Sequence, residues 1–137
     1  MAYTARDYMS RKFVTFSPDM DVLEATDLMV RHGLSGGPVV DRTGNLVGVI
    51  SEIDCLTAAI QGAYHASGGG RVKEVMRTSF TTVEVDDSIM HVAKLLLNMK
   101  DYYYRAFPVM KQNRVVGRIM LRDVLKAFED MSQEDED

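Results

Sequence analysis

Residues 46–56 of the chain are LVGVISEIDCL, and residues 115–125 are VVGRIMLRDVL. Placed on each other at a shift of 69 residues, the two stretches share a Val-Gly pair, an isoleucine, an aspartate and a leucine. In each stretch a short apolar run, typical of a strand, leads directly into the apolar spacing of a helix. The same strand-to-helix junction therefore occurs twice in this chain.

The repeat extends well beyond these two stretches. At a shift of 67 residues Met9 falls on Met76 and Asp19 on Asp86, and at a shift of 70 Pro38 falls on Pro108. The shift changes only in turns, as expected when each copy is one structural unit. Between the copies, the Ser-Gly-Gly-Gly run predicts a flexible linker. We predict a first motif at 1–62, a linker at 63–70, a second motif at 71–131 and an acidic tail at 132–137.

Each copy has the same predicted order of elements. Apolar residues at helical spacing form one face of a first helix, from Val22 to His32 and from Ile89 to Met99, with His32 at a core or near-core position. Two strands follow in each copy, and a second helix closes it. The predicted strands are 37–41, 45–50, 107–111 and 114–119. Helices that alternate with short strands predict an α/β fold, with short sheets packed against helices.

Composition excludes several classes of function. Apolar runs are far shorter than the roughly 20 residues of a membrane helix, and the amino terminus has no signal segment, so we expect a cytoplasmic protein without membrane contact. Six of the 20 acidic residues follow Phe128, and the rest of the chain has no clustered basic face for nucleic acid. Cys55 is the one cysteine and is expected to be a small buried residue. No nucleophile–base pair, phosphate-binding glycine loop or metal-ligand spacing is evident, so we predict neither an enzyme nor a metal site.

Taken together, these features resemble the cystathionine β-synthase (CBS) domain, whose signature is Gly-hydrophobic-x-Ser/Thr-x-x-Asp. Gly48 to Asp54 match it fully, whereas Gly117 to Asp123 have Met120 where the family prefers a hydroxyl. The resemblance covers the chain from about Ala5 to Phe128. It implies two tandem CBS motifs with pseudo-two-fold symmetry, forming a stand-alone Bateman module. Such modules commonly bind AMP, ADP, ATP or related adenosyl ligands in the cleft between the motifs, and commonly pair into discs of four motifs. We expect a homodimer that forms through apolar surface on the helix faces of Val22 and Ile89.

The signature carboxylates Asp54 and Asp123 are the candidate ribose ligands. A carboxylate accepts hydrogen bonds from two adjacent hydroxyl groups, and Ser51 at the start of the helix is able to donate to a sugar or phosphate oxygen. A purely structural role is the alternative, because Ser51 and Asp54 also have the spacing of a helix-capping pair. Met120 cannot cap in this way, which hints at a further role for Asp123. We expect Asp54, completed by Ser51, to contribute more to binding.

Other residues are candidates for the base and the phosphates. The extended segments around Thr15 and Phe16, and around Thr82 and Val83, could offer backbone groups to an adenine edge, unless they are simply core strands. Arg105 is the candidate phosphate clamp because its planar guanidinium binds phosphate oxygens in pairs, and a solvated loop arginine is the alternative. The chain near Gly37 and Pro38, and near Ala106 and Pro108, completes the predicted ligand contacts.

Three hypotheses for function follow. The first is a regulatory module that senses an adenine nucleotide, requires no cofactor and acts on a partner protein that the sequence does not identify. The second is an interaction or scaffold protein of the same fold without a bound nucleotide, favoured by Met120. The third, a hydrolase or transferase acting on nucleotides, lacks a catalytic carboxylate cluster. A run of tyrosines at 102–104 could stack a base, but is more typical of a loop that packs on the core.

Overall fold

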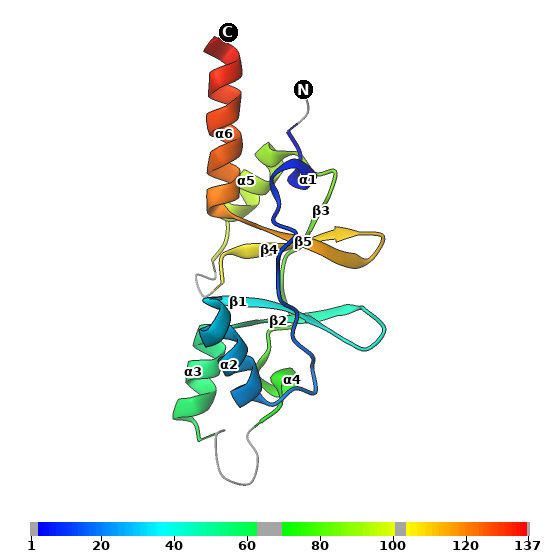
Figure 1. The fold of residues 1–137 in the computed structure, drawn as a ribbon, viewed down its shortest axis with the longest axis vertical. Coiled ribbons are helices and arrows are strands. Elements are labelled where there is room, and N and C mark those ends of the chain that lie inside the picture. Colours follow the sequence, from blue (N-terminus) through cyan, green and yellow to red (C-terminus); the bar gives the residue numbers. More distant parts are fainter. Residues whose placement is uncertain (1–2, 63–69, 101–103, 137) are drawn as a thin grey trace. The chain divides into compact units, whose positions relative to one another are not determined.

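The structure, a computed structural model, describes residues 3–62, 70–100 and 104–136 (Figure 1). Most of the predicted linker and two of the three tyrosines at 102–104 lie outside these residues. The elements are α1 (Ala5–Tyr8), α2 (Val22–His32), β1 (Gly36–Val40), β2 (Leu46–Ser51), α3 (Glu52–Ile60), α4 (Val72–Val75), β3 (Val83–Glu84), α5 (Ile89–Leu97), β4 (Ala106–Lys111), β5 (Arg114–Met120) and α6 (Leu121–Glu136).

The chain divides into two compact units, each with its own hydrophobic core. Residues 14–80 form one unit, and residues 1–13 together with 81–137 form the other. The core of the first contains Phe16, Val39 and Ile50, and the core of the second contains Val83, Phe107 and Ile119. These residues come from the strands and from the extended segment of Phe16 beside β1, and they pack against the buried faces of helices, as expected of an α/β fold.

In the unit of residues 14–80, β1 and β2 form an antiparallel hairpin in which Gly36 pairs with Ser51 and Pro38 with Val49. Phe16 adds to the free side of β1 in a parallel bridge with Val39, and Arg77 adds to the free side of β2 in an antiparallel bridge with Val49. Helices α2 and α3 lie side by side next to the hairpin (Figure 1). Val22, Ala25 and Met29 turn the apolar face of α2 towards the core.

The other unit repeats this arrangement. Its sheet has the order β3-β4-β5, with Val83 parallel to Val109 and β4 antiparallel to β5. Ser10 closes the far side of β5 through two backbone hydrogen bonds with Arg118, of 2.8 and 2.9 Å. Helix α5 buries Ile89, Val92 and Leu96, and α6 packs beside it.

The compact units do not coincide with the sequence repeats, because each repeat lends its opening segment to the sheet formed by the other. Ser10 precedes the first repeat's strands but pairs with β5, and Arg77 precedes the second repeat's strands but pairs with β2. Ser10 and Arg77 are equivalent positions at the shift of 67 residues. The two repeats are therefore tied together by exchanged segments.

Most of the predicted elements are confirmed, as is the α/β fold. Each predicted strand lies within one residue of its observed bounds at either end, and Cys55 is buried. The prediction for His32 is wrong, because this residue is exposed at the last position of α2. The helix ends there since Gly33 adopts a left-handed conformation and its N–H turns back to the carbonyl groups of Met29 and Val30. None of the helices in the described ranges has the length and apolar character needed to cross a membrane.

Candidate functional site

In each unit, the predicted site residues gather at one end of the sheet. In the first unit β1 begins, β2 ends and α3 begins at the same place, because Gly36 pairs with Ser51 and the Glu52 N–H donates to the carbonyl of Ser35 over 2.9 Å. We call this the first sheet end, comprising Thr15, Gly37, Pro38, Ser51 and Asp54. The second sheet end is its equivalent in the other unit and comprises Thr82, Ala106, Pro108, Met120 and Asp123.

At the first sheet end, Ser51 and Asp54 form a complete helix-capping box. The Asp54 N–H donates to Ser51 Oγ over 3.2 Å, and the Ser51 N–H and hydroxyl both donate to Asp54 Oδ2 over 2.9 Å. Ser51 is fully buried. The capping role that the sequence suggested is therefore present. The Ser51 hydroxyl donates its one hydrogen bond to Asp54 and not to a ligand.

The second oxygen of Asp54 is occupied by Arg77. Arg77 Nε donates to Asp54 Oδ1 over 3.2 Å, and the Asp54 side chain is only 10% exposed. Arg77 is held in place by two backbone hydrogen bonds with Val49, of 2.8 and 2.9 Å. Sequence reasoning missed Arg77, because only the exchange of segments between repeats brings it to this carboxylate. The one available signal was its alignment with Ser10.

At the second sheet end, Asp123 caps α6 without help from a hydroxyl group. The Met120 N–H donates to Asp123 Oδ2 over 2.8 Å, as the Ser51 N–H does to Asp54. Asp123 accepts the backbone N–H of Met120, three positions earlier, and this capping role explains in part why the aspartate is present without a hydroxyl residue at position 120. Within the described residues this is the one hydrogen bond of the Asp123 carboxylate, which is half-buried. The two signature aspartates therefore differ in how much acceptor capacity the protein leaves free.

The extended segments supply both core side chains and an open strand edge. Phe16 and Val83 are buried core residues, and the Phe16 N–H and C=O both bond to β1, through Pro38 and Val40. Backbone groups alternate in direction along a strand, so those of Thr15 point away from β1. Thr15 and Thr82 form no backbone hydrogen bond with other described residues, and β3 is an edge strand. Their polar groups lie at the open edge of each sheet.

Close packing determines which residues are possible at the candidate ligand contacts in β1 and β4. A side chain at Gly37 would place its Cβ 2.7 Å from Phe16 Cε2 and 3.0 Å from the Val14 carbonyl oxygen, so this glycine is required for close approach of the Phe16 segment. Pro38, Ala106 and Pro108 are buried within β1 and β4. The side chains of these residues are therefore packed inside their own units.

Arg105 and the tyrosine that precedes it are engaged inside their unit. Arg105 Nη2 donates to the carbonyl of Leu96 over 2.9 Å and thereby caps the carboxyl end of α5. Tyr104 is buried, and burial raises the pKa of its phenol above the ordinary value, an effect that the nearby positive charge of Arg118 offsets only in part. Tyr104 thus packs, as expected of this loop, and a role of Arg105 in binding phosphate stays a prediction.

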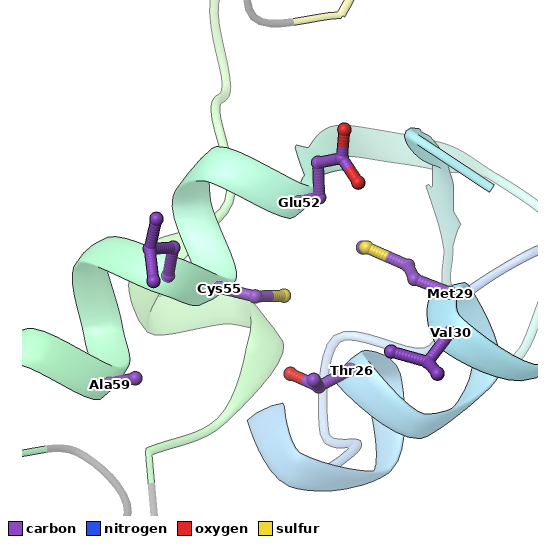
Figure 2. Close-up of a pocket in the computed structure, with 7 residues that line it drawn as sticks. Thr26, Met29, Val30, Glu52, Cys55 and Ala59 are labelled. Atoms are coloured by element: carbon purple, nitrogen blue, oxygen red, sulfur yellow. The ribbon is translucent and has the colours of Figure 1, made fainter. Parts of the chain in front are cut away.

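A separate apolar groove of about 310 Å³ lies between α2 and α3 (Figure 2). Figure 2 shows Thr26, Met29 and Cys55 pointing into it. Burial raises the pKa of the Cys55 thiol, which keeps the thiol protonated and apolar. The remaining lining residues are Val30, Glu52, Leu56 and Ala59. In the described part of the chain, no cluster of three or more His, Cys, Asp or Glu side chains could hold a metal ion.

Comparison with known proteins identifies the repeat. The family model of the CBS domain matches residues 5–61 and again residues 72–130. The CBS domain-containing protein YhcV of Bacillus subtilis is 31% identical over 132 residues, which cover 96% of this chain and 88% of YhcV. A longer relative, the L-aspartate semialdehyde sulfurtransferase of Methanocaldococcus jannaschii, is 27% identical over 124 residues. These residues cover 90% of this chain but only 23% of that protein.

Two solved CBS structures with bound ligands have the same fold. The structure of CBSX2 in complex with AMP is 27% identical, with a TM-score of 0.80 over 96% of this chain and 99% of that one. The CBS domain pair of protein MJ0100, in complex with 5′-methylthioadenosine and S-adenosyl-L-methionine, is 25% identical. Its TM-score is 0.77 over 96% of this chain and 99% of that one.

Proposed function

Because the chain belongs to the CBS domain family, we propose that it is a regulatory module that binds an adenine nucleotide or a related adenosyl ligand and catalyses no reaction itself. The bound ligands of CBSX2 and of the MJ0100 domain pair support this class, since all of them contain an adenine base on a ribose. The observation that carries the proposal is the unused hydrogen-bonding capacity of the Asp123 carboxylate, which lies at the end of a sheet with an open edge.

Asp123 suits a ribose for a chemical reason. A carboxylate has about four acceptor positions, and the Met120 N–H uses one of them. The 2′- and 3′-hydroxyl groups of a ribose are adjacent donors, which one carboxylate can bind together through charge-assisted hydrogen bonds. The outward backbone groups of Thr82 can pair with the edge of an adenine ring as an added strand would. The amino end of α6 nearby favours the negative charge of a phosphate.

A ligand screen tests the proposal directly. We expect AMP, ADP, ATP or S-adenosylmethionine at about 100 times its dissociation constant to stabilise the protein by about 2.7 kcal/mol, or on the order of 10 °C in melting temperature. Thermal melts with each compound at millimolar concentration measure this. If none of the four shifts the melt, the scaffold hypothesis replaces the nucleotide-binding one.

The variant Asp123→Asn tests the ribose contact itself. Asparagine keeps an oxygen for the Met120 N–H but removes the charge, so the cap survives while affinity falls at least about tenfold. Isothermal titration calorimetry measures the affinity. Glu129→Gln, on the exposed surface of the same helix, makes the same change in net charge and serves as the control. Equal affinity of Asp123→Asn and the wild type would contradict the assignment of Asp123.

We further propose that the module forms a homodimer through its helices, although not through Val22 and Ile89 as expected from the sequence, because both are fully buried in the core. Large apolar side chains are exposed at equivalent positions in both repeats, including Val30 at 77% and Leu97 at 81%. Leu23 and Met90 form a second equivalent pair, and Leu56 and Leu125 form a third. Ile60 and Leu121 are also exposed, without an apolar equivalent. Exposed apolar surface of this kind is typical of an interface, and a second copy offers the same surface for a symmetric contact. The groove between α2 and α3 lies within this surface.

A further inference from the structure

The two sheet ends are built alike, but they differ in the residue that the exchanged segment brings to them. Asp54 and Asp123 are equivalent, whereas Arg77 at the first sheet end has Ser10 as its equivalent at the second. We infer that Arg77 acts as an internal ligand that closes the first sheet end to ribose, so that each chain binds its nucleotide at Asp123 only. This inference rests on the proposed function.

The acceptor capacity of the two carboxylates supports this difference. Asp54 Oδ2 accepts two hydrogen bonds from Ser51, and Oδ1 accepts one from Arg77 Nε. Asp123, by contrast, has one hydrogen bond from the described residues, at Oδ2. The Asp54 side chain is also only 10% exposed. A ribose that approaches Asp54 therefore finds only one of about four acceptor positions unused, which is too few for both of its adjacent hydroxyl groups.

Replacing Arg77 by a ribose is unfavourable for two reasons. The bond from guanidinium to carboxylate is charge-assisted on both sides, and is stronger than the bond from a neutral hydroxyl group. Arg77 is also held in place, because its backbone pairs with Val49 over 2.8 and 2.9 Å and its carbonyl oxygen lies against Gly48. The arginine thus loses little additional freedom by binding Asp54, whereas a free ligand loses much more.

Calorimetric stoichiometry on the full chain tests this inference, with AMP and S-adenosylmethionine as the titrants. We expect one ligand per chain for the wild type. In Arg77→Ser, which places at the first sheet end the residue found at the second, we expect two ligands per chain. Adding Asp54→Asn to this variant should return the value to one, because the carboxylate that was opened is lost. Arg77→Gln, which keeps a long polar side chain without the charge, should also give two and serves if Arg77→Ser does not fold.

The outcomes separate this inference from the proposed function. Two ligands per chain in the wild type, or weaker binding without Arg77, would overturn the inference and leave nucleotide binding intact. Weaker binding without Arg77 would mean that the arginine assists the ligand, for example at a phosphate. No heat of binding in the wild type or in either Arg77 variant would overturn the proposed function instead. Binding by the Arg77 variants but not by the wild type would support the closing role of Arg77 and would remove Asp123 from the site.

Discussion

At the scale of the residue, Gly48 and Gly117 show why the signature begins with glycine. A Cβ at Gly48 would lie 2.7 Å from Met76 Sδ and 2.8 Å from the Arg77 carbonyl oxygen. At Gly117 it would lie 2.7 Å from Met9 Sδ and 2.9 Å from the Ser10 carbonyl oxygen. Neither glycine has a positive φ, so close approach of the exchanged segment, and not backbone conformation, requires it.

We therefore predict that Gly48→Ala destabilises the protein by about 1–3 kcal/mol, because the added methyl group must displace backbone as well as Met76. Urea denaturation measures the change. Gly70→Ala is the matched control, since among the described residues its Cβ would meet only Glu74 Oε1, at 3.9 Å. Equal stability of the two variants would mean that the exchanged segment yields easily.

At the scale of the element, α6 is fastened to α1 by a tyrosine. The Tyr8 hydroxyl donates to Asp130 Oδ2 over 2.8 Å, and the ring of Tyr3 stacks on Tyr8 at a centroid distance of 6.2 Å. Lys126 binds the same carboxylate over 3.1 Å. Helix α6 continues through the acidic carboxyl end of the chain to Glu136.

This contact predicts a loss of stability at high pH. Partial burial and the hydrogen bond to Asp130 raise the pKa of Tyr8 to about 12, from 10.0 in the unfolded chain. The folded state therefore favours the neutral phenol, and the resulting stability is complete below pH 10 and is lost as the pH rises towards 12. Melting temperatures measured across this interval should fall less steeply for Tyr8→Phe than for the wild type. Parallel slopes would show that the Tyr8 contact does not contribute.

At the scale of the whole molecule, the exposed helix faces predict self-association. Val30→Glu and Leu97→Glu place a charge on highly exposed positions, so each chain should still fold while the dimer weakens. Sedimentation at tens of micromolar should show a dimer for the wild type and mostly monomer for the double variant. Arg42→Gln, in the exposed turn between β1 and β2, changes the charge by the same amount as either single substitution and should remain dimeric. A monomeric wild type, with and without nucleotide, would contradict the proposal.

Much of this architecture could be predicted because the same sequence pattern occurs twice in the chain. Val47, Gly48 and Asp54 recur at the shift of 69 residues, and apolar spacing alone located α2, α5 and the strands. Periodicity could not predict the exposure of His32, because one helix ends at that position and the equivalent Met99 lies beyond the end of α5. A helical pattern shows which residues share a face, but not where the helix stops.

The sequence by itself determined the repeat, the α/β fold and the two signature aspartates, because these depend on local patterns and on their recurrence. Only the tertiary structure decided which neighbours those aspartates have. Arg77 lies 23 positions from Asp54, and no local rule links the two. They meet because the segment that opens one repeat completes the sheet formed by the other. The bond from Arg77 to Asp54 Oδ1 is therefore created by the long-range pairing of the exchanged segment, and short-range pattern cannot show it.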